Sequence, residues 1–466
     1  MSTTTSTSVE SSSLKRSLTL WDLILYGVIV IQPVAPMSVF GVLSDRGHGH
    51  VVTTILIAMV AMLFTAISYG RMARAYPSAG SAFTYVGQEI NPALGYVTGW
   101  SMVMDYLLNP IICTVWCSQW AHVSVQNVPY WAWAIFFALV FTLLNVQGVK
   151  TSARVNTALA IGMGVVIAIF FVAAARFIFG NPHDGTGFFT RPFYDPQLWN
   201  LRAVLGGTSI AVLTYIGFDG ISTLSEEVEN PRRNILLATV LTCLVIGILS
   251  AFEVYAAQLV WPASEPFPNV DTAFTFVAQR AWPPLFAVLG FTLLVANFGS
   301  GMGAQLGAAR LLYGMGRSNA LPKSFFGVVD KKHRVPRNNV LFVGGLALVV
   351  ALLVIVPFRG QTVCDGTVFC YGLGAEMLNF GALIAFMGVN AAAFIRYFVR
   401  EKRYTIWNFA PPVAGFLICL LLWLNLSTPA KIAGGIWMAV GIAVGAWKTK
   451  GFRGNLINFE LPPENE

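Results

Sequence analysis

Twelve apolar stretches, each long enough to cross a lipid bilayer, follow one another along this chain. A transmembrane helix needs roughly 20 predominantly apolar residues, and 56% of the 466 residues are hydrophobic while only 11% are charged. We therefore expect an all-α polytopic membrane protein. The predicted spans cover residues 21–43, 51–73, 83–122, 130–147, 153–180, 200–225, 234–261, 283–315, 339–357, 371–398, 407–425 and 429–447.

The first and the sixth predicted spans are interrupted in their middles. In the first, Gln32–Pro36 separates two apolar runs, and in the sixth, Ile216–Gly220 precedes a polar helix that we expect to continue through Glu227. A break inside lipid leaves backbone N–H and C=O groups unpaired, so it is tolerated only where protein surrounds it or where it lines a cavity. Paired broken spans in two halves of a chain indicate the binding site of a secondary transporter.

The positions of the breaks predict an internal organisation. Spans 1–5 (18–180) and spans 6–10 (198–398) form two halves, and the odd number of spans per half makes the second inverted relative to the first. Two further spans (405–447) are expected to serve packing or a homodimer contact. The Ser/Thr-rich tail 1–17 and the tail 448–466 complete the chain.

The distribution of basic residues predicts the orientation. Of the 29 Lys and Arg residues, 22 lie on one side of the predicted spans, which places both termini in the cytoplasm. The net charge of +8 therefore reflects the basic residues on the cytoplasmic side of the membrane, and the chain has no soluble basic face to which a nucleic acid could bind. Neither a nucleotide-binding loop nor an HExxH pairing is present, so we expect no ATP-driven pump, no enzyme, no metal site and no cofactor.

Four acidic residues lie inside predicted spans: Asp105, Asp219, Glu253 and Glu376. Charged groups in a membrane are costly and mark functional sites by default. No Lys or Arg lies at mid-span to neutralise them. The resulting acidic field favours a cationic ligand or protons that are taken up and released.

Asp219 is the strongest of these candidates. It lies at the sixth-span break, and Ser222, Thr223 and Glu226 follow on one helical face that leads toward the cytoplasm. Ligand binding and capping of the following half-helix are both consistent with this position.

The other three carboxylates have weaker contexts. Glu376, with Asn379 one turn later, is expected to hold an amine or to close an outer gate, unless it is merely exposed at the start of its span. Asp105 belongs to a polar patch with Tyr106, for which a structural hydrogen-bond network is an equal alternative. Glu253 has no polar companion at helical spacing.

Aromatic residues near the breaks suit an organic ammonium ion, because each ring face contributes roughly 0.5–2 kcal/mol by cation–π attraction. Packing is the alternative role for most of them. Gln32 and two prolines occupy the first break in place of a glycine pair that could cradle a carboxylate. This favours an amine over an α-amino acid. The aromatic candidates are Tyr26, Tyr106, Trp116, Tyr215, Phe218 and Tyr371.

The six cysteines fall into two groups. Cys113, Cys117, Cys243 and Cys419 sit in apolar spans, where they are expected to be small core residues. Cys364 and Cys370 flank an outward-facing loop, where a disulfide is possible in an oxidising compartment. The sequence leaves this pairing open.

Six stretches of the chain resemble the amino acid–polyamine–organocation (APC) superfamily, and within it the bacterial putrescine importers. They extend across most of the chain and are fairly specific. The stretches are Phe64–Gly70, Tyr76–Ala82, Gly99–Ser101 with Asp105–Leu107, Gly217–Ser222 with Leu224–Glu227, Pro322–Gly327 and Asn379–Phe386.

The resemblance implies the five-plus-five inverted-repeat fold of leucine-type transporters and uptake of small amines driven by the proton gradient. It implies that Tyr106 and the stretch Gly217–Asp219 contact substrate, and that Glu226 and Glu227 belong to the inner gate. This sequence departs from the family at Glu376, where importers carry a small residue. It departs again in span five, which lacks the lysine that couples protons in some relatives.

These observations predict a transporter of the bacterial inner membrane that imports putrescine or a related polyamine with protons. An amino-acid permease, or an amino acid/amine exchanger, is the alternative. The expected proton carriers are Asp219, Asp105 or Glu376. The expected substrate-binding residues are Gln32, Tyr106, Tyr215, Gly217, Phe218, Asp219, Ser222 and Glu376, and the expected gating or coupling residues are Asp105, Glu226, Glu227 and Tyr371.

Overall fold

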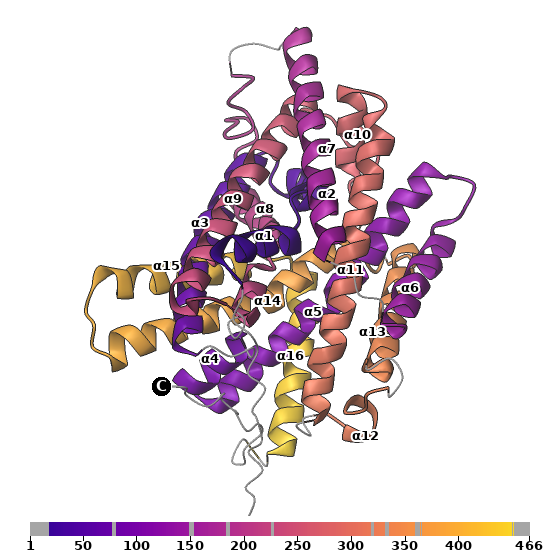
Figure 1. Cartoon of the computed structure of the whole chain (residues 1–466). Helices are drawn as coiled ribbons and strands as arrows, with labels where there is room; N and C mark the ends of the chain where they lie inside the picture. Colours follow the sequence, from indigo (N-terminus) through magenta and orange to yellow (C-terminus); the bar gives the residue numbers. More distant parts are fainter. Residues whose placement is uncertain are drawn as a thin grey trace, which may run out of the picture.

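The computed structural model shows an all-helical bundle in which long helices are tilted against one another (Figure 1). The structure describes residues 18–76, 81–148, 153–182, 187–224, 228–317, 321–330, 335–358, 364, 366–449 and 451. Within these ranges, extended structure is limited to two isolated bridges. The first half of the chain contains α1 (Leu20–Ile31), α2 (Ala35–Arg46), α3 (Val51–Ala75), α4 (Ser81–Glu89), α5 (Pro92–Ser124), α6 (Tyr130–Val146) and α7 (Ala153–Gly180).

The second half begins with a helix that continues in two short 3₁₀ turns, and its tenth predicted span ends in a π-helical turn, η4. Its elements are α8 (Leu201–Ala211), η1 (Val212–Tyr215), η2 (Phe218–Leu224), α9 (Pro231–Val260), α10 (Ala273–Ala281), α11 (Leu285–Arg317), α12 (Lys323–Phe326), α13 (Arg337–Leu352), η3 (Leu353–Ile355), α14 (Tyr371–Phe394) and η4 (Ile395–Arg400). Two C-terminal helices follow, α15 (Ile406–Leu424) and α16 (Thr428–Lys448).

The membrane character of the chain is confirmed. In the described ranges, nine helices are long and apolar enough to cross a bilayer, and the bent pair α1–α2 raises this number to ten. The predicted third span differs from the structure, because it is divided into α4, which ends at Glu89, and α5, whose first turn is capped by Asn91. The Asn91 side chain accepts a hydrogen bond from the Ala93 amide at 2.7 Å, and Pro92 stands at the first helical position, where its missing N–H costs nothing.

The break in the first span lies where the sequence predicts it. The chain bends by 47° between α1 and α2. Gln32 adopts a positive φ of 71°, outside helical geometry, and ends α1, while Pro36 occupies the first turn of α2. Thr19 and Asp22 form a reciprocal capping box at the start of α1.

The break in the sixth span takes a different form. After α8 the chain tightens into η1, turns at Gly217 with φ of 120°, and resumes as η2. This φ is strained for any residue with a side chain. The polar helix expected through Glu227 is a 3₁₀ segment up to Leu224, and residues 225–227 lie outside the described residues.

The core is built around two helix groups. Helix α3 packs along α9, and α5 packs between α11 and α14. The C-terminal helices attach to these groups: α15 lies against α14 and α3, and α16 lies against α5 and α14. Trp100 and Trp437 stack at 4.9 Å, and each indole N–H donates to the other residue's carbonyl, at 2.9 and 3.1 Å. The predicted packing role of the last two spans is thus met at α16 by a specific contact with α5.

A buried carboxylate joins three elements at one end of the bundle, where α3 and α14 end; we call this the basic end. Glu89, 1% exposed, lies 2.5 Å from Arg396 Nη1 and 3.0 Å from Arg400 Nη1, and it accepts a hydrogen bond from Tyr76 at 2.7 Å. Burial, together with this hydrogen bond, raises the pKa of Tyr76 to about 12, so the phenol keeps its proton. The cluster fixes α4 to the ends of α3 and α14.

Replacing Glu89 by Gln should therefore destabilise the fold. The change removes a 1% exposed carboxylate from two arginines, and of the described carboxylates Arg396 keeps only Glu401, at 3.3 Å. Breaking a buried pair of this kind costs about 3 kcal/mol. The matched control is Glu265→Gln, because Glu265 pairs with Arg280 at 2.5 Å but is 45% exposed, and such pairs contribute about 0–1 kcal/mol. Thermal unfolding of the purified variants measures both. Equal melting temperatures for the two variants would show that the Glu89 cluster does not hold the helices together.

Candidate functional site

Asp219 lies directly at the sixth-span break. Its carboxylate accepts a hydrogen bond from the Gly217 amide at 3.3 Å, and its carbonyl accepts one from the Ser222 hydroxyl at 2.6 Å. The side chain is buried, with 7% exposed. Ser222 also lies 3.4 Å from the Ser81 hydroxyl at the start of α4. The carboxylate thus closes its own turn.

A second carboxylate lies near Asp219. Asp105, from the middle of α5, is buried and close enough to interact electrostatically with Asp219. Among the residues that the structure describes, none forms an ion pair with either carboxylate. Two neighbouring carboxylates in a membrane interior attract a cation or protons, because nothing else there compensates their charge.

Tyrosine side chains surround this acidic pair. Tyr106 interacts electrostatically with Asp219, with Asp105 and with Tyr26 of α1. Its ring covers Gly307 of α11, where an added Cβ would lie 3.2 Å from the ring. The sixth-span break, α1, α5 and α11 therefore meet at one place, as the paired-break argument predicts.

Two further tyrosines near Asp219 escaped the sequence analysis. Tyr69 of α3 and Tyr85 of α4 both interact electrostatically with Asp219. Their rings lie 6.1 Å apart, and Tyr69 meets Phe218 edge-on at 5.5 Å. Both tyrosines sit in helices without a break, so local sequence gave no signal. Only the approach of α3 and α4 to η2 brings them to the carboxylate.

The two aromatic residues of the break itself are packed into protein. Phe218 is fully buried, 5.4 Å from Phe386 of α14. Tyr215 is fully buried as well, and its hydroxyl donates to the Ile55 carbonyl of α3 at 2.9 Å. In this conformation both residues pack the break against α14 and α3. Packing is the alternative role that the sequence left open for such aromatic residues.

Gln32 connects the first break to α11. Its side-chain amide donates to the Ala296 carbonyl at 2.6 Å. One turn further along α2, Ser38 accepts a hydrogen bond from Asn297 at 3.1 Å. The break that is short of backbone donors is thus connected to α11 by a side chain.

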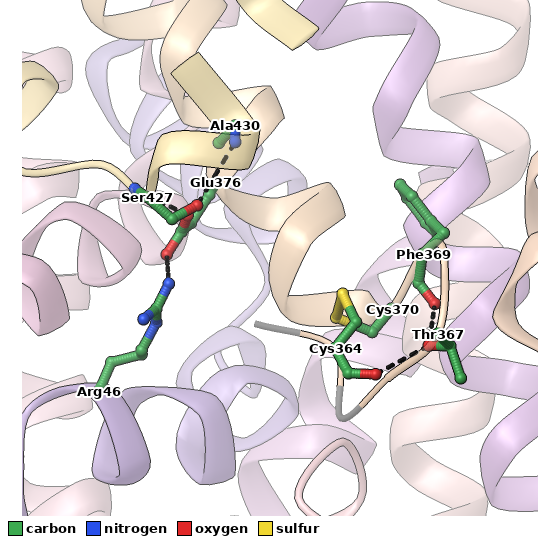
Figure 2. The surroundings of a disulfide bond; sticks show 8 residues. All are labelled: Arg46, Cys364, Thr367, Phe369, Cys370, Glu376, Ser427 and Ala430. Carbon is green, nitrogen blue, oxygen red and sulfur yellow. Dashed lines mark hydrogen bonds and ion pairs between the residues drawn. A yellow bond between two sulfur atoms is a disulfide. The ribbon is translucent and has the colours of Figure 1, made fainter. Parts of the chain in front are cut away.

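Glu376 has a different environment from the one expected. It is 3% exposed, its Oε1 lies 2.7 Å from Arg46 Nη2, and its Oε2 accepts a hydrogen bond from the Ser427 amide at 3.0 Å (Figure 2). The expectation that no basic residue neutralises it is therefore wrong. Arg46 ends α2, so the pair joins the first span to α14 and to the start of α16. The carboxylate that accompanies Asp219 is Asp105.

The remaining candidates are not brought to the acidic pair by any contact in the described residues. Tyr371, 2% exposed, begins α14 and interacts with Cys113 of α5. Glu253 is fully buried in α9, and neither carboxylate oxygen has a hydrogen-bond partner in the described part of the chain. Glu226 and Glu227 lie outside the described residues.

The loop that precedes α14 is closed by a disulfide. Cys364 and Cys370 are bonded, with their Cα atoms 5.4 Å apart (Figure 2). The Thr367 hydroxyl donates to the carbonyls of Cys364 and Phe369, at 2.9 and 3.1 Å. Of the two possibilities left open by the sequence, the structure shows the bonded one. In the described ranges, no group of three or more His, Cys, Asp or Glu side chains is arranged to hold a metal ion.

Comparison with known proteins shows the family to which the chain is similar. Residues 33–435 match the amino acid permease family. The chain is 34% identical over 456 residues to the low-affinity putrescine importer PlaP of Escherichia coli K12, with 96% of each chain covered. It is 25% identical to the branched-chain amino acid permease BcaP of Bacillus subtilis, with 93% of this chain and 92% of that protein covered. It is 26% identical to cationic amino acid transporter 6 of Arabidopsis thaliana, with 80% and 66% covered.

The match covers most of the chain, and the relatives are named as importers, permeases and transporters rather than enzymes. The chain belongs to the amino acid permease family of the APC superfamily.

Proposed function

We propose that this protein is a secondary active transporter that imports a small organic amine, putrescine or a related polyamine, by alternating access. The observation that carries the proposal is the pair Asp219 and Asp105, two buried carboxylates without an ion-pair partner in the described residues, at a helix break and beside tyrosine rings. A diamine has two ammonium ends for two carboxylates. The similarity to the putrescine importer PlaP supports the same substrate class.

Each site residue has a role in this proposal. Asp219 and Asp105 bind the ammonium groups, and Tyr106 offers a ring face to them. Phe218, Tyr215 and Ser222 position the break, whose Gly217 provides the turn.

The transport cycle needs an energy source and two gates. Protons are the proposed coupling ion, carried by one member of the acidic pair. Gln32 couples the first break to α11 during the cycle. Tyr371 and the Arg46–Glu376 pair close the outer side, and Glu226 and Glu227 belong to the inner gate. Import driven by protons requires that the proton and the amine are bound at the same time when the site changes its accessibility, which couples the two events.

The proposed setting is the bacterial inner membrane. Twelve spans, arranged as two inverted five-span repeats with two added helices, place both termini in the cytoplasm. The nine to ten spans that satisfy length and hydropathy, and the excess of basic residues at one end, support this topology. A homodimer is part of the proposal for the last two helices.

An amino-acid permease or exchanger is the alternative function. The similarity to BcaP and to a plant cationic amino acid transporter favours it. In that case one carboxylate binds the α-ammonium group, and a backbone amide near a helix start binds the carboxylate.

Replacement of Asp219 by Asn should abolish uptake of radiolabelled putrescine in proteoliposomes, because the amide offers no charge to an ammonium group. The control is Glu265→Gln, which removes a carboxylate outside the site and should leave uptake unchanged. Normal putrescine uptake by the Asp219→Asn variant would end the assignment of this residue.

Diamines should stabilise the purified wild-type protein against thermal unfolding, and amino acids should not. A ligand that binds only the folded state adds about 2.7 kcal/mol at a concentration 100 times its Kd. Putrescine, cadaverine, leucine and lysine form the panel. Stabilisation by the amino acids alone would select the permease alternative.

Replacing Arg46 and replacing Glu376 should lower the stability of the fold by different amounts. Arg46→Gln leaves a 4% exposed carboxylate without its cation, which costs about 3 kcal/mol, whereas Glu376→Gln leaves a 32% exposed arginine that reaches water and costs less. Thermal unfolding measures this difference. Putrescine binding should survive Glu376→Gln. Its loss would instead show that Glu376 holds one end of the substrate.

A further inference from the structure

The basic end of the bundle contains a cavity that the proposed transport does not use. It measures about 370 Å³ and lies between the end of α3, η4 and the segment that leads into α15. This size falls within the range of about 300–1,000 Å³ that is typical of small-ligand pockets. Its lining comprises four arginines, one glutamate and two other residues: Arg71, Arg74, Arg396, Arg403, Glu401, Ala75 and Tyr397.

The cavity has an excess of positive charge. Glu401 lies 3.3 Å from Arg396 Nε and 2.9 Å from Arg403 Nε, and Glu89 lies 2.5 Å from Arg396 Nη1, so the carboxylates here pair with two of the four arginines. In the described ranges, Arg71 donates only to neutral groups of α15, including the Trp407 carbonyl at 2.8 Å. Arg74 is exposed and has no hydrogen bond or ion pair with any residue that the structure describes. An anion would therefore be attracted to a site that the protein's own carboxylates only partly neutralise.

The guanidinium groups are held in place for such an anion. Arg71 lies over the Tyr397 ring at 4.6 Å from its centroid, and Arg396 lies at 5.7 Å from the same ring. Guanidinium groups with fixed planes form paired hydrogen bonds to phosphate oxygens. The side chains of Arg71 and Arg396 are thus already ordered before a ligand binds, so binding costs less conformational entropy.

Exposed aromatic and aliphatic residues follow the cavity lining along the chain. Tyr404, Ile406 and Trp407 are 69%, 68% and 71% exposed immediately after Arg403. Aromatic residues of this kind mark the membrane–water interface.

A second cavity adjoins the first. It measures about 410 Å³, lies between α3 and α9, and shares Arg74 with the first cavity. Its other lining residues are Arg233, Leu236 and Leu237. A soluble anion gains no binding energy from the leucines and the exposed aromatic residues, whereas the acyl chains of a lipid gain apolar contacts with them.

We propose that this cavity binds the phosphate headgroup of an anionic phospholipid, with the acyl chains against the adjoining leucines and the exposed aromatic residues. Basic pockets between the ends of membrane helices bind such headgroups. A bound lipid would connect the ends of α3, α14 and α15, beside the Glu89 cluster. The proposal is independent of which substrate the protein transports.

The test uses the full-length protein in nanodiscs of three kinds: phosphatidylcholine alone, phosphatidylcholine with phosphatidylglycerol, and phosphatidylcholine with added inorganic phosphate. Native mass spectrometry counts retained lipid, and thermal unfolding reports stability. We expect retained phosphatidylglycerol and a raised melting temperature only in the second preparation. Stabilisation by inorganic phosphate to the same extent would overturn the lipid in favour of a free anion, and absence of retained phosphatidylglycerol would overturn the site.

Two variants localise the binding. Arg74→Gln and Arg403→Gln remove exposed arginines of the cavity, so folding should be preserved. Each should weaken phosphatidylglycerol retention about fivefold, the factor that corresponds to about 1 kcal/mol for one basic residue near anionic lipid. Arg202→Gln, an exposed arginine at the start of α8, is the matched control and should retain the lipid as wild type does. An equal loss in the control would show a general charge effect and contradict a built site.

Discussion

The fold depends on one constraint: backbone N–H and C=O groups inside a membrane must find partners within the protein. Continuous helices meet this requirement by themselves, and the two breaks meet it by local turns and by side chains. At the first break the Ala35 amide donates to the Gln32 carbonyl, and at the sixth the Asp219 carboxylate accepts from the Gly217 amide. Helices α3, α5, α11 and α14 have to lie near the breaks for this reason. The acidic site is therefore a product of the same packing that permits the breaks.

Much of this architecture follows from sequence, because apolar length and helix breakers act locally. The bend at Gln32 and the turn at Gly217 were both predictable from residue type. The third span was not predicted as two helices, although Asn91 followed by Pro92 is a strong local start signal. The sixth break was predicted in place, but its 3₁₀ geometry depends on contacts with α3 and α9 that sequence does not state.

Side-chain partners across the bundle were harder to predict. Asp219 lies at the break as the sequence predicts, but the sequence analysis assigns Glu376 to the substrate site with it and Asp105 to coupling. The packing of α5 instead brings Asp105 near Asp219. Glu376 had no visible cation, because Arg46 is 330 residues earlier in the chain. Tyr69 and Tyr85 were missed for the same reason. Long-range pairing decides these roles, and a hydropathy pattern contains no information about it.

The stacked pair Trp100 and Trp437 has a mechanical consequence. Their reciprocal hydrogen bonds fasten α5 to α16, and α5 carries Asp105 five residues after Trp100. The outer face of α16 presents Ile432 and Ile436, 58% and 62% exposed, to its surroundings. A lipid or a second copy of the chain that packs against this face also restrains α5, the helix that carries Asp105. Membrane thickness and crowding therefore affect where the Asp105 carboxylate lies.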